Sequence, residues 1–87
     1  MTEREDDAII VRLTQDEALI LSDWIYRLQR DREMRDRCVD DKAVWLPLYR
    51  LSGTLETTLP EIFAADYAGK VASARARLLA KLGDVES

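Results

Sequence analysis

Apolar residues recur along most of the chain at intervals of three or four positions, which is the spacing of an amphipathic helix. Three stretches show it, at residues 14–32, 44–58 and 66–82. The charged run 30–37 alternates in sign with almost no apolar residue, as a solvated helix end and its following loop would. The pattern therefore predicts three main helices, and short connections predict that consecutive helices are antiparallel neighbours.

The first helix has a defined start and a defined core face. Thr14 and Glu17 form a capping box, in which each side chain accepts a hydrogen bond from the other residue's backbone amide. At about 100° per residue, one arc of this helix collects the apolar side chains of Ala18, Leu21, Trp24, Ile25 and Leu28. Leu19 and Tyr26 fall on the opposite side, so we expect them outside the core.

The start of the second helix leaves two alternatives. Asp40 and Asp41 supply acidic residues for a helix N-terminus, where the helix dipole favours them. Pro47 is compatible only with a first turn or a kink. Either a short turn at 41–46 precedes a helix that begins near Pro47, or one continuous helix bends there.

Proline, aspartate and glycine predict the remaining boundaries. Pro60 forces Leu59 out of the α region and ends the second helix, and residues 60–63 fit one short helical turn. Asp66 is the expected cap of the third helix, and Gly83 is favourable just past its end. We expect the stripes to share one core, formed by Leu21, Trp24, Ile25, Leu28, Leu48, Leu51, Leu55, Val71 and Leu78.

Residues 8–13 have a different pattern from the rest of the chain. They concentrate β-branched residues, and Ile9, Val11 and Leu13 alternate as in a half-buried strand. No other segment has strand spacing, so this one would pair outside the chain or lie as an arm across the helices. The predicted fold class is mainly α, a small three-helix bundle preceded by one short N-terminal β-strand or extended arm. The predicted organisation is an acidic flexible tail at 1–7, a single helical domain at 8–83 and a fraying C-terminus at 84–87.

Composition narrows the class of protein. The 87 residues bound the chain to one small domain, and 47% hydrophobic residues with only 3 Gly and 2 Pro predict that it folds. A net charge of −4 repels phosphate backbones, so we expect no nucleic-acid partner. The acidic start lacks the features of a secretory signal, and no apolar run approaches the about 20 residues of a membrane span. We therefore expect a cytoplasmic protein with no membrane partner.

Candidate catalytic chemistry is sparse. The chain has no histidine, which excludes Ser-His, Cys-His and His-metal sites. Its single cysteine, Cys38, has no partner for an internal disulfide and is interpreted as a buried or inert loop cysteine. The neighbouring acids in the chain are interpreted as tail or helix starts. We expect no enzyme activity, no catalytic residue, no cofactor and no metal.

Apolar residues also lie outside the three stripes, although a monomeric bundle needs only one stripe per helix. Either they contact a partner, or the N-terminal segment folds over one face and the others are isolated exposed residues. We favour a non-catalytic protein–protein interaction module, oligomeric or bound to one protein partner. The expected interface consists of Ile9, Ile10, Val11, Leu19, Tyr26, Trp45 and Tyr49.

Two other functions remain as alternatives. A small acidic chain matches the charge of a basic enzyme, as an immunity or antitoxin-like inhibitor would. A small DNA-binding regulator would need a phosphate-contacting patch made by Arg27, Arg30, Arg32, Arg35 and Arg37. Three acidic residues interrupt that patch, namely Asp31, Glu33 and Asp36.

The run from Leu13 to Trp24, LTQDEALILSDW, together with LSGTLE at 51–56, resembles a family of short, acidic, uncharacterised bacterial proteins. The likeness extends loosely over residues 8–80. It implies a stand-alone cytosolic product. It implies no activity, cofactor or catalytic residue.

Overall fold

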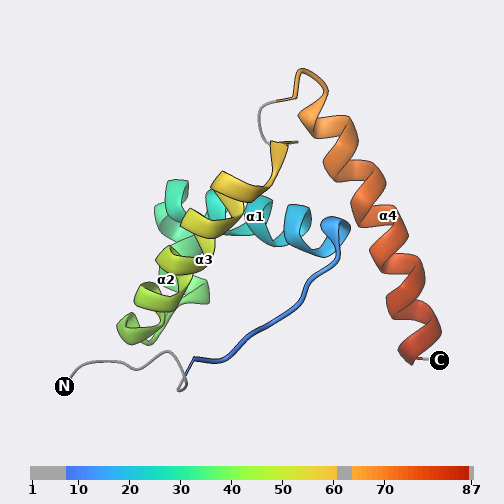
Figure 1. Ribbon diagram of the computed structural model, residues 1–87. Helices are drawn as coiled ribbons and strands as arrows, with labels where there is room; N and C mark the ends of the chain where they lie inside the picture. The colour runs from blue at the N-terminus through green and yellow to red at the C-terminus, as the bar shows by residue number, and fades with distance from the viewer. Residues whose placement is uncertain (1–7, 61–63, 87) are drawn as a thin grey trace.

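The computed structural model describes residues 8–60 and 64–86, and this part of the chain is mainly helical, as predicted (Figure 1). In chain order, its elements are α1 (Gln15–Arg30), α2 (Arg32–Cys38), a 3-10 turn η2 (Lys42–Val44), α3 (Trp45–Thr58) and α4 (Tyr67–Glu86). The predicted tail at 1–7 and residues 61–63 of the predicted helical turn lie outside the described residues.

The capping box at the start of α1 is confirmed. The Thr14 amide donates to Oε1 of Glu17 at 2.7 Å, and the Glu17 amide donates to Oγ1 of Thr14 at 3.2 Å. Two amides that have no partner within the helix are thereby satisfied. The same contacts lower the pKa of the Glu17 carboxyl, because hydrogen bonds from Thr14 favour its charged form.

The charged run after α1 is solvated, as predicted, but it is helical rather than a loop. Asp31 ends α1, and its Oδ1 accepts a hydrogen bond from the Met34 amide at 3.1 Å, which caps a second helix. This short helix, α2, contains no buried residue. The prediction of a helix end followed by a loop overlooked Asp31, which serves as the cap of both helices.

At α3 the structure selects the first of the two alternatives. Asp41 caps the 3-10 turn η2 by accepting from the Ala43 amide at 3.0 Å, and α3 begins directly afterwards at Trp45. Pro47 thus lies in the first turn, where its missing N–H has no intrahelical partner to lose. The helix ends at Thr58 with Leu59 as its C-cap, as the following proline predicted.

Helix α1 lies between α3 and α4 (Figure 1). One buried cluster joins α1 to α3 and consists of Ala18, Ile25, Leu28, Leu48, Leu55 and Leu59. A second cluster joins α1 to α4 and consists of Leu19, Val71 and Ala74. The three predicted stripes therefore do not share one core. Within the described residues, α3 and α4 make no extensive contact with each other.

This arrangement differs from the predicted three-helix bundle, and the burial of two residues differs from the prediction. Leu51 is 38% exposed rather than buried, because α4 packs on the far side of α1 and leaves that flank of α3 uncovered. Leu19 was placed outside the core but is only 3% exposed, because α4 covers it. A single stripe per helix was the wrong rule for α1.

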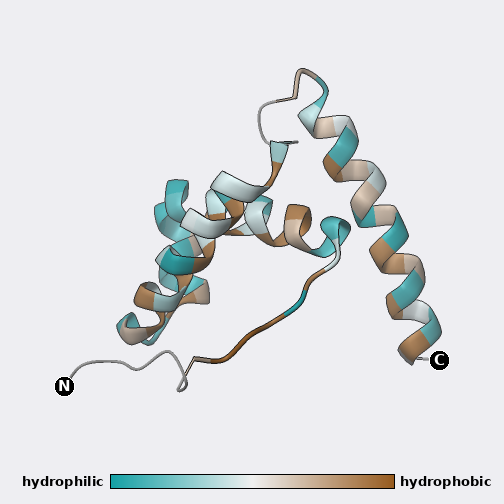
Figure 2. Ribbon diagram, in the orientation of Figure 1, coloured by the Kyte–Doolittle hydropathy of each residue, from teal (hydrophilic) through white to brown (hydrophobic). Residues whose placement is uncertain are grey.

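The two ends of the described chain also differ from expectation. Residues 8–14 form no strand, and Figure 1 shows them as an extended trace leading away from α4. Of the two predicted alternatives, strand or extended arm, the structure therefore agrees with the extended arm. At the other end, α4 continues through Gly83 to Glu86, so the predicted helix end at Gly83 was wrong. Figure 2 shows hydrophobic residues along the N-terminal trace and in the last turns of α4.

Candidate interaction surface

The N-terminal arm, defined as residues 8–13, is the most exposed apolar segment of the described chain. Ile9 is 88% exposed, Ile10 is 86% exposed and Val11 is 72% exposed. These values show that the helices do not cover the three side chains. The segment also has no strand pairing for its backbone amides and carbonyls. Three of the seven predicted interface residues therefore lie together on an accessible and unpaired segment.

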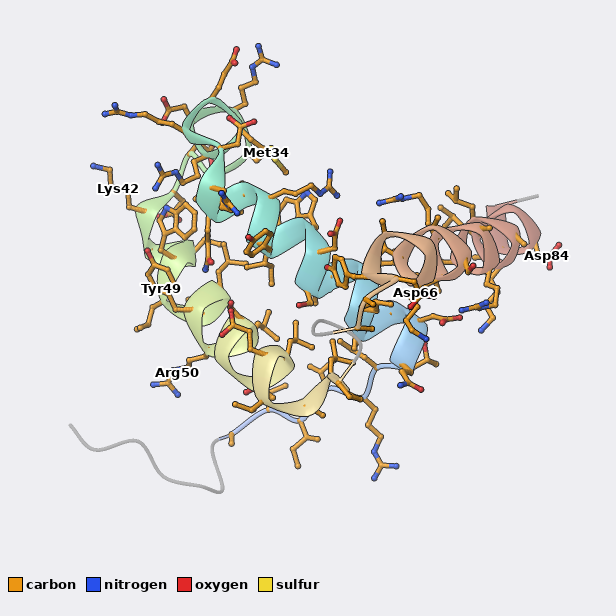
Figure 3. The ribbon with its side chains drawn as sticks, turned by 90° about the horizontal axis from the view of Figure 1, so that it is seen from above. Met34, Lys42, Tyr49, Arg50, Asp66 and Asp84 are labelled. Atoms are coloured by element: carbon orange, nitrogen blue, oxygen red, sulfur yellow. The ribbon has the colours of Figure 1, made fainter. Side chains whose placement is uncertain are left out.

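The aromatic residues predicted for the interface lie on two other elements. Trp45 and Tyr49 stack in the first turns of α3, with ring centroids 5.6 Å apart and an interplanar angle of 29°. Trp45 is half-buried against the α1–α3 cluster, whereas Tyr49 is 57% exposed. Figure 3 shows Tyr49 and Arg50 at the outer edge of α3, on the side away from α4. The stacked pair thus connects the core to the surface.

Tyr26 is half-exposed near the end of α1, and its ring is partly shielded by Arg30. The Arg30 guanidinium lies 5.3 Å from the ring centroid and donates a hydrogen bond to the Tyr26 hydroxyl. Leu19, the last predicted interface residue, is buried under α4 and is not offered to a partner. Of the seven, five are exposed, one is half-buried and one belongs to the core.

A polar network between α1 and α4 was not predicted from the sequence. The Tyr67 hydroxyl donates to Oδ1 of Asp23 at 3.0 Å, and Nε of Arg27 donates to Oδ2 at 3.0 Å. Burial raises the pKa of Tyr67 to about 12, and the hydrogen bond to Asp23 and its charge add to this. With its pKa raised, the Tyr67 hydroxyl stays protonated at neutral pH and donates a hydrogen bond to the Asp23 carboxylate. The network therefore fastens α4 to α1 rather than supplying a base.

The opposite end of the same contact carries a bidentate ion pair. Nε of Arg77 donates to Oδ2 of Asp16 at 2.7 Å, and Nη2 of Arg77 donates to Oδ1 at 2.9 Å. The hydrogen bond from Arg77 lowers the pKa of the Asp16 carboxyl. The pKa of Glu17 is also lowered, whereas a carboxyl that acts as a general acid needs a raised pKa. The two residues line a groove of about 450 Å³ between the start of α1 and α4, together with Lys70 and Ser73.

The arginine cluster proposed for nucleic acid lies at the junction of α1 and α2, beside a groove of about 640 Å³. Besides Arg30, which contacts Tyr26, two of its members form ion pairs with nearby acids. Arg27 pairs with Asp23 at 3.0 Å, and Arg37 pairs with Glu33 at 2.8 Å. These acids reduce the positive charge that phosphate groups would meet. Cys38, interpreted as a buried or loop cysteine, is instead exposed at the last position of α2.

Across residues 8–60 and 64–86, no group of three or more His, Cys, Asp or Glu side chains is placed to hold a metal ion. Within the same ranges, no helix has the length and apolar content needed to cross a membrane. No protein-family model, curated protein or solved structure matches the chain. The resemblance of residues 13–24 and 51–56 to short acidic bacterial proteins therefore stays a prediction.

Proposed function

We propose that this chain is a non-catalytic protein-interaction module, which acts as an oligomer or bound to one protein partner. The observation that carries the proposal is the N-terminal arm, where Ile9, Ile10 and Val11 are 72–88% exposed on an extended and unpaired backbone. Single exposed apolar residues are normal on protein surfaces, but consecutive ones on an extended backbone are typical of a contact site.

Burial of the arm by a partner is favourable on two grounds. Burial of apolar surface is favourable by about 25 cal/mol for each Å² removed from water, and isoleucine and valine have large apolar side chains. The free amides and carbonyls of residues 8–13 match the edge of a β-sheet, to which an extended segment adds as a further strand. The arm therefore suits a second copy of the chain or the sheet of another protein.

The substitution Ile10→Lys tests the proposal, because it places a charge in the expected contact. Sedimentation at micromolar concentration measures self-association, and immobilised chain measures capture of partner proteins. We expect Ile10→Lys to lose the assembly formed by the unchanged chain while circular dichroism shows the same helix content. Ala80→Lys is the matched control, because it puts the same charge on an exposed position of α4.

Two results would contradict the proposal. In the first, the unchanged chain sediments as a monomer, and Ile10→Lys captures every protein that the unchanged chain captures. The other is an assembly that Ile10→Lys and Ala80→Lys affect equally.

A further inference from the structure

The two buried clusters on α1 differ in size. Among the described residues, the cluster with α3 contains several large aliphatic side chains, namely Ile25, Leu28, Leu48, Leu55 and Leu59. Trp24 and Trp45 also pack against it. The cluster with α4 is made by Leu19, Val71 and the small Ala74. Because hydrophobic stabilisation grows with the apolar area removed from water, apolar contacts hold α4 less firmly than they hold α3.

Helix α1 covers only the first half of α4. Asp16, in the first turn of α1, is paired with Arg77, and the chain before Thr14 leads away from α4 (Figure 1). Val71 lies before that level and is 4% exposed, whereas Leu82 lies after it and is 48% exposed. The 20 residues of α4 are therefore fastened to α1 along about half of their length.

Polar contacts at two levels complete the attachment of α4. Arg77 pairs with Asp16, but its side chain is 58% exposed, and exposed ion pairs contribute little because water and salt screen them. The hydrogen bond from the Tyr67 hydroxyl to Asp23 is better shielded, since the side chain of Asp23 is only 14% exposed. Arg75 lies 3.9 Å from the same carboxylate. The hydrogen bond of Tyr67 is therefore the polar contact whose loss should weaken the attachment most.

Helix α3 does not hold α4 in place. Within the described residues, α3 and α4 make no extensive contact. The α1–α3 cluster ends along the chain at Leu59, and α4 begins at Tyr67. Removal of α4 from α1 therefore leaves the members of the α1–α3 cluster in contact with each other.

We propose that α4 separates from α1 as one unit and uncovers Leu19, while α1 and α3 stay packed together. Parts of a fold that are held by few apolar contacts open at a lower free energy than the whole chain unfolds. The closed form covers the apolar side chain of Leu19, and the open form exposes it. The inference does not rest on the proposed function, because the N-terminal arm is exposed in the closed form and contributes nothing to the α1–α4 cluster.

Thiol labelling of the full chain tests the opening in a Cys38→Ser background, because Cys38 is the only native cysteine. Leu19→Cys reports the α1–α4 contact, and Leu28→Cys reports the α1–α3 cluster. The two leucines are 3% and 0% exposed on the same helix, which matches the two variants. Each labelling rate is divided by the rate of the same variant unfolded in urea. We expect Leu19→Cys to react about tenfold faster than Leu28→Cys or more, because its exposure requires only the departure of α4.

Tyr67→Phe tests which contact keeps α4 closed, because it removes the hydroxyl and keeps the ring. We expect Tyr67→Phe to speed the labelling of Leu19→Cys about tenfold and to change that of Leu28→Cys by less than about twofold. Tyr49→Phe is the matched control, since Tyr49 lies on the side of α3 away from α4 (Figure 3). It should leave the labelling of Leu19→Cys unchanged.

Equal labelling rates for Leu19→Cys and Leu28→Cys would show that the three helices open together, and would overturn the inference. A Tyr67→Phe substitution that speeds both cysteines equally, or neither, would overturn it as well. If one of the leucine variants does not fold, Ala74→Cys and Ala18→Cys repeat the comparison with a smaller change of volume. Ala74 is buried in the α1–α4 cluster, and Ala18 is buried in the α1–α3 cluster.

Discussion

Leu19 and Leu28 lie nine residues apart on α1, which places them about 180° apart around the helix, and both are buried. Leu28 belongs to the cluster with α3, and Leu19 belongs to the cluster with α4. A helix buried on two opposite sides is a central layer. Consequently α3 and α4 each have one side that faces α1 and another side that no helix in the described chain covers.

Leu55 and Leu51 should respond very differently to truncation, although both belong to the predicted stripe of α3. Leu55 is 6% exposed and faces α1, so Leu55→Ala should lower the free energy of unfolding by about 2–5 kcal/mol. Leu51 is 38% exposed, so Leu51→Ala should cost about 1 kcal/mol. Urea unfolding followed by circular dichroism measures both. Equal losses would show that Leu51 is covered by a helix after all.

The ion pair between Asp16 and Arg77 should make stability depend on pH in the acid range. Because Arg77 lowers the folded pKa of Asp16, the pair stabilises the fold above the unfolded pKa of about 3.9. That contribution is lost as the pH falls through the lower folded value. We expect thermal unfolding of Arg77→Gln to depend less on pH than the unchanged chain does in this range. An NMR titration in which Arg77→Gln leaves the pKa of Asp16 unchanged would contradict the assignment.

Tyr67 should ionise only at strongly alkaline pH while the chain is folded. Its folded pKa of about 12 lies above the unfolded value of about 10, so its contribution to stability is complete below pH about 10. It is lost as the pH rises from there through about 12. Near-ultraviolet absorbance of the chain minus that of Tyr67→Phe isolates this phenolate. Asp23→Asn should lower the pKa of Tyr67, because it removes the charge beside the hydroxyl, whereas Asp31→Asn should not.

Local chemistry was sufficient to predict most helix boundaries from the sequence. Thr14 with Glu17 starts α1, Asp41 caps the turn before α3, and Leu59 before Pro60 ends α3. Each boundary depends on hydrogen bonds or steric contacts within about four residues, which the sequence places directly. There were two exceptions. Asp31, the cap shared by α1 and α2, was overlooked. Gly83 was predicted to end α4, but glycine permits a helix end without requiring one. The helix passes through it to Glu86.

The seven residues predicted for the interface show where such local reasoning fails. The sequence left open whether Ile9, Ile10 and Val11 pair outside the chain or lie across the helices, and in the structure the helices leave these side chains uncovered. Leu19 has the same apolar character, and α4 covers it. The sequence identified an additional apolar face on α1 but contained no signal that said whether a partner or α4 would occupy it.

The sequence by itself therefore determined the three long helices and which of their faces are apolar, because both depend on residue spacing and on neighbours along the chain. Only the tertiary structure decided which faces meet. Val71 and Leu82 share one stripe of α4, and their burial differs because α1 begins at Gln15 and extends no further along that helix. Burial depends on the length and crossing of a second helix, and these are set by packing across the whole chain rather than by the pattern of either helix alone.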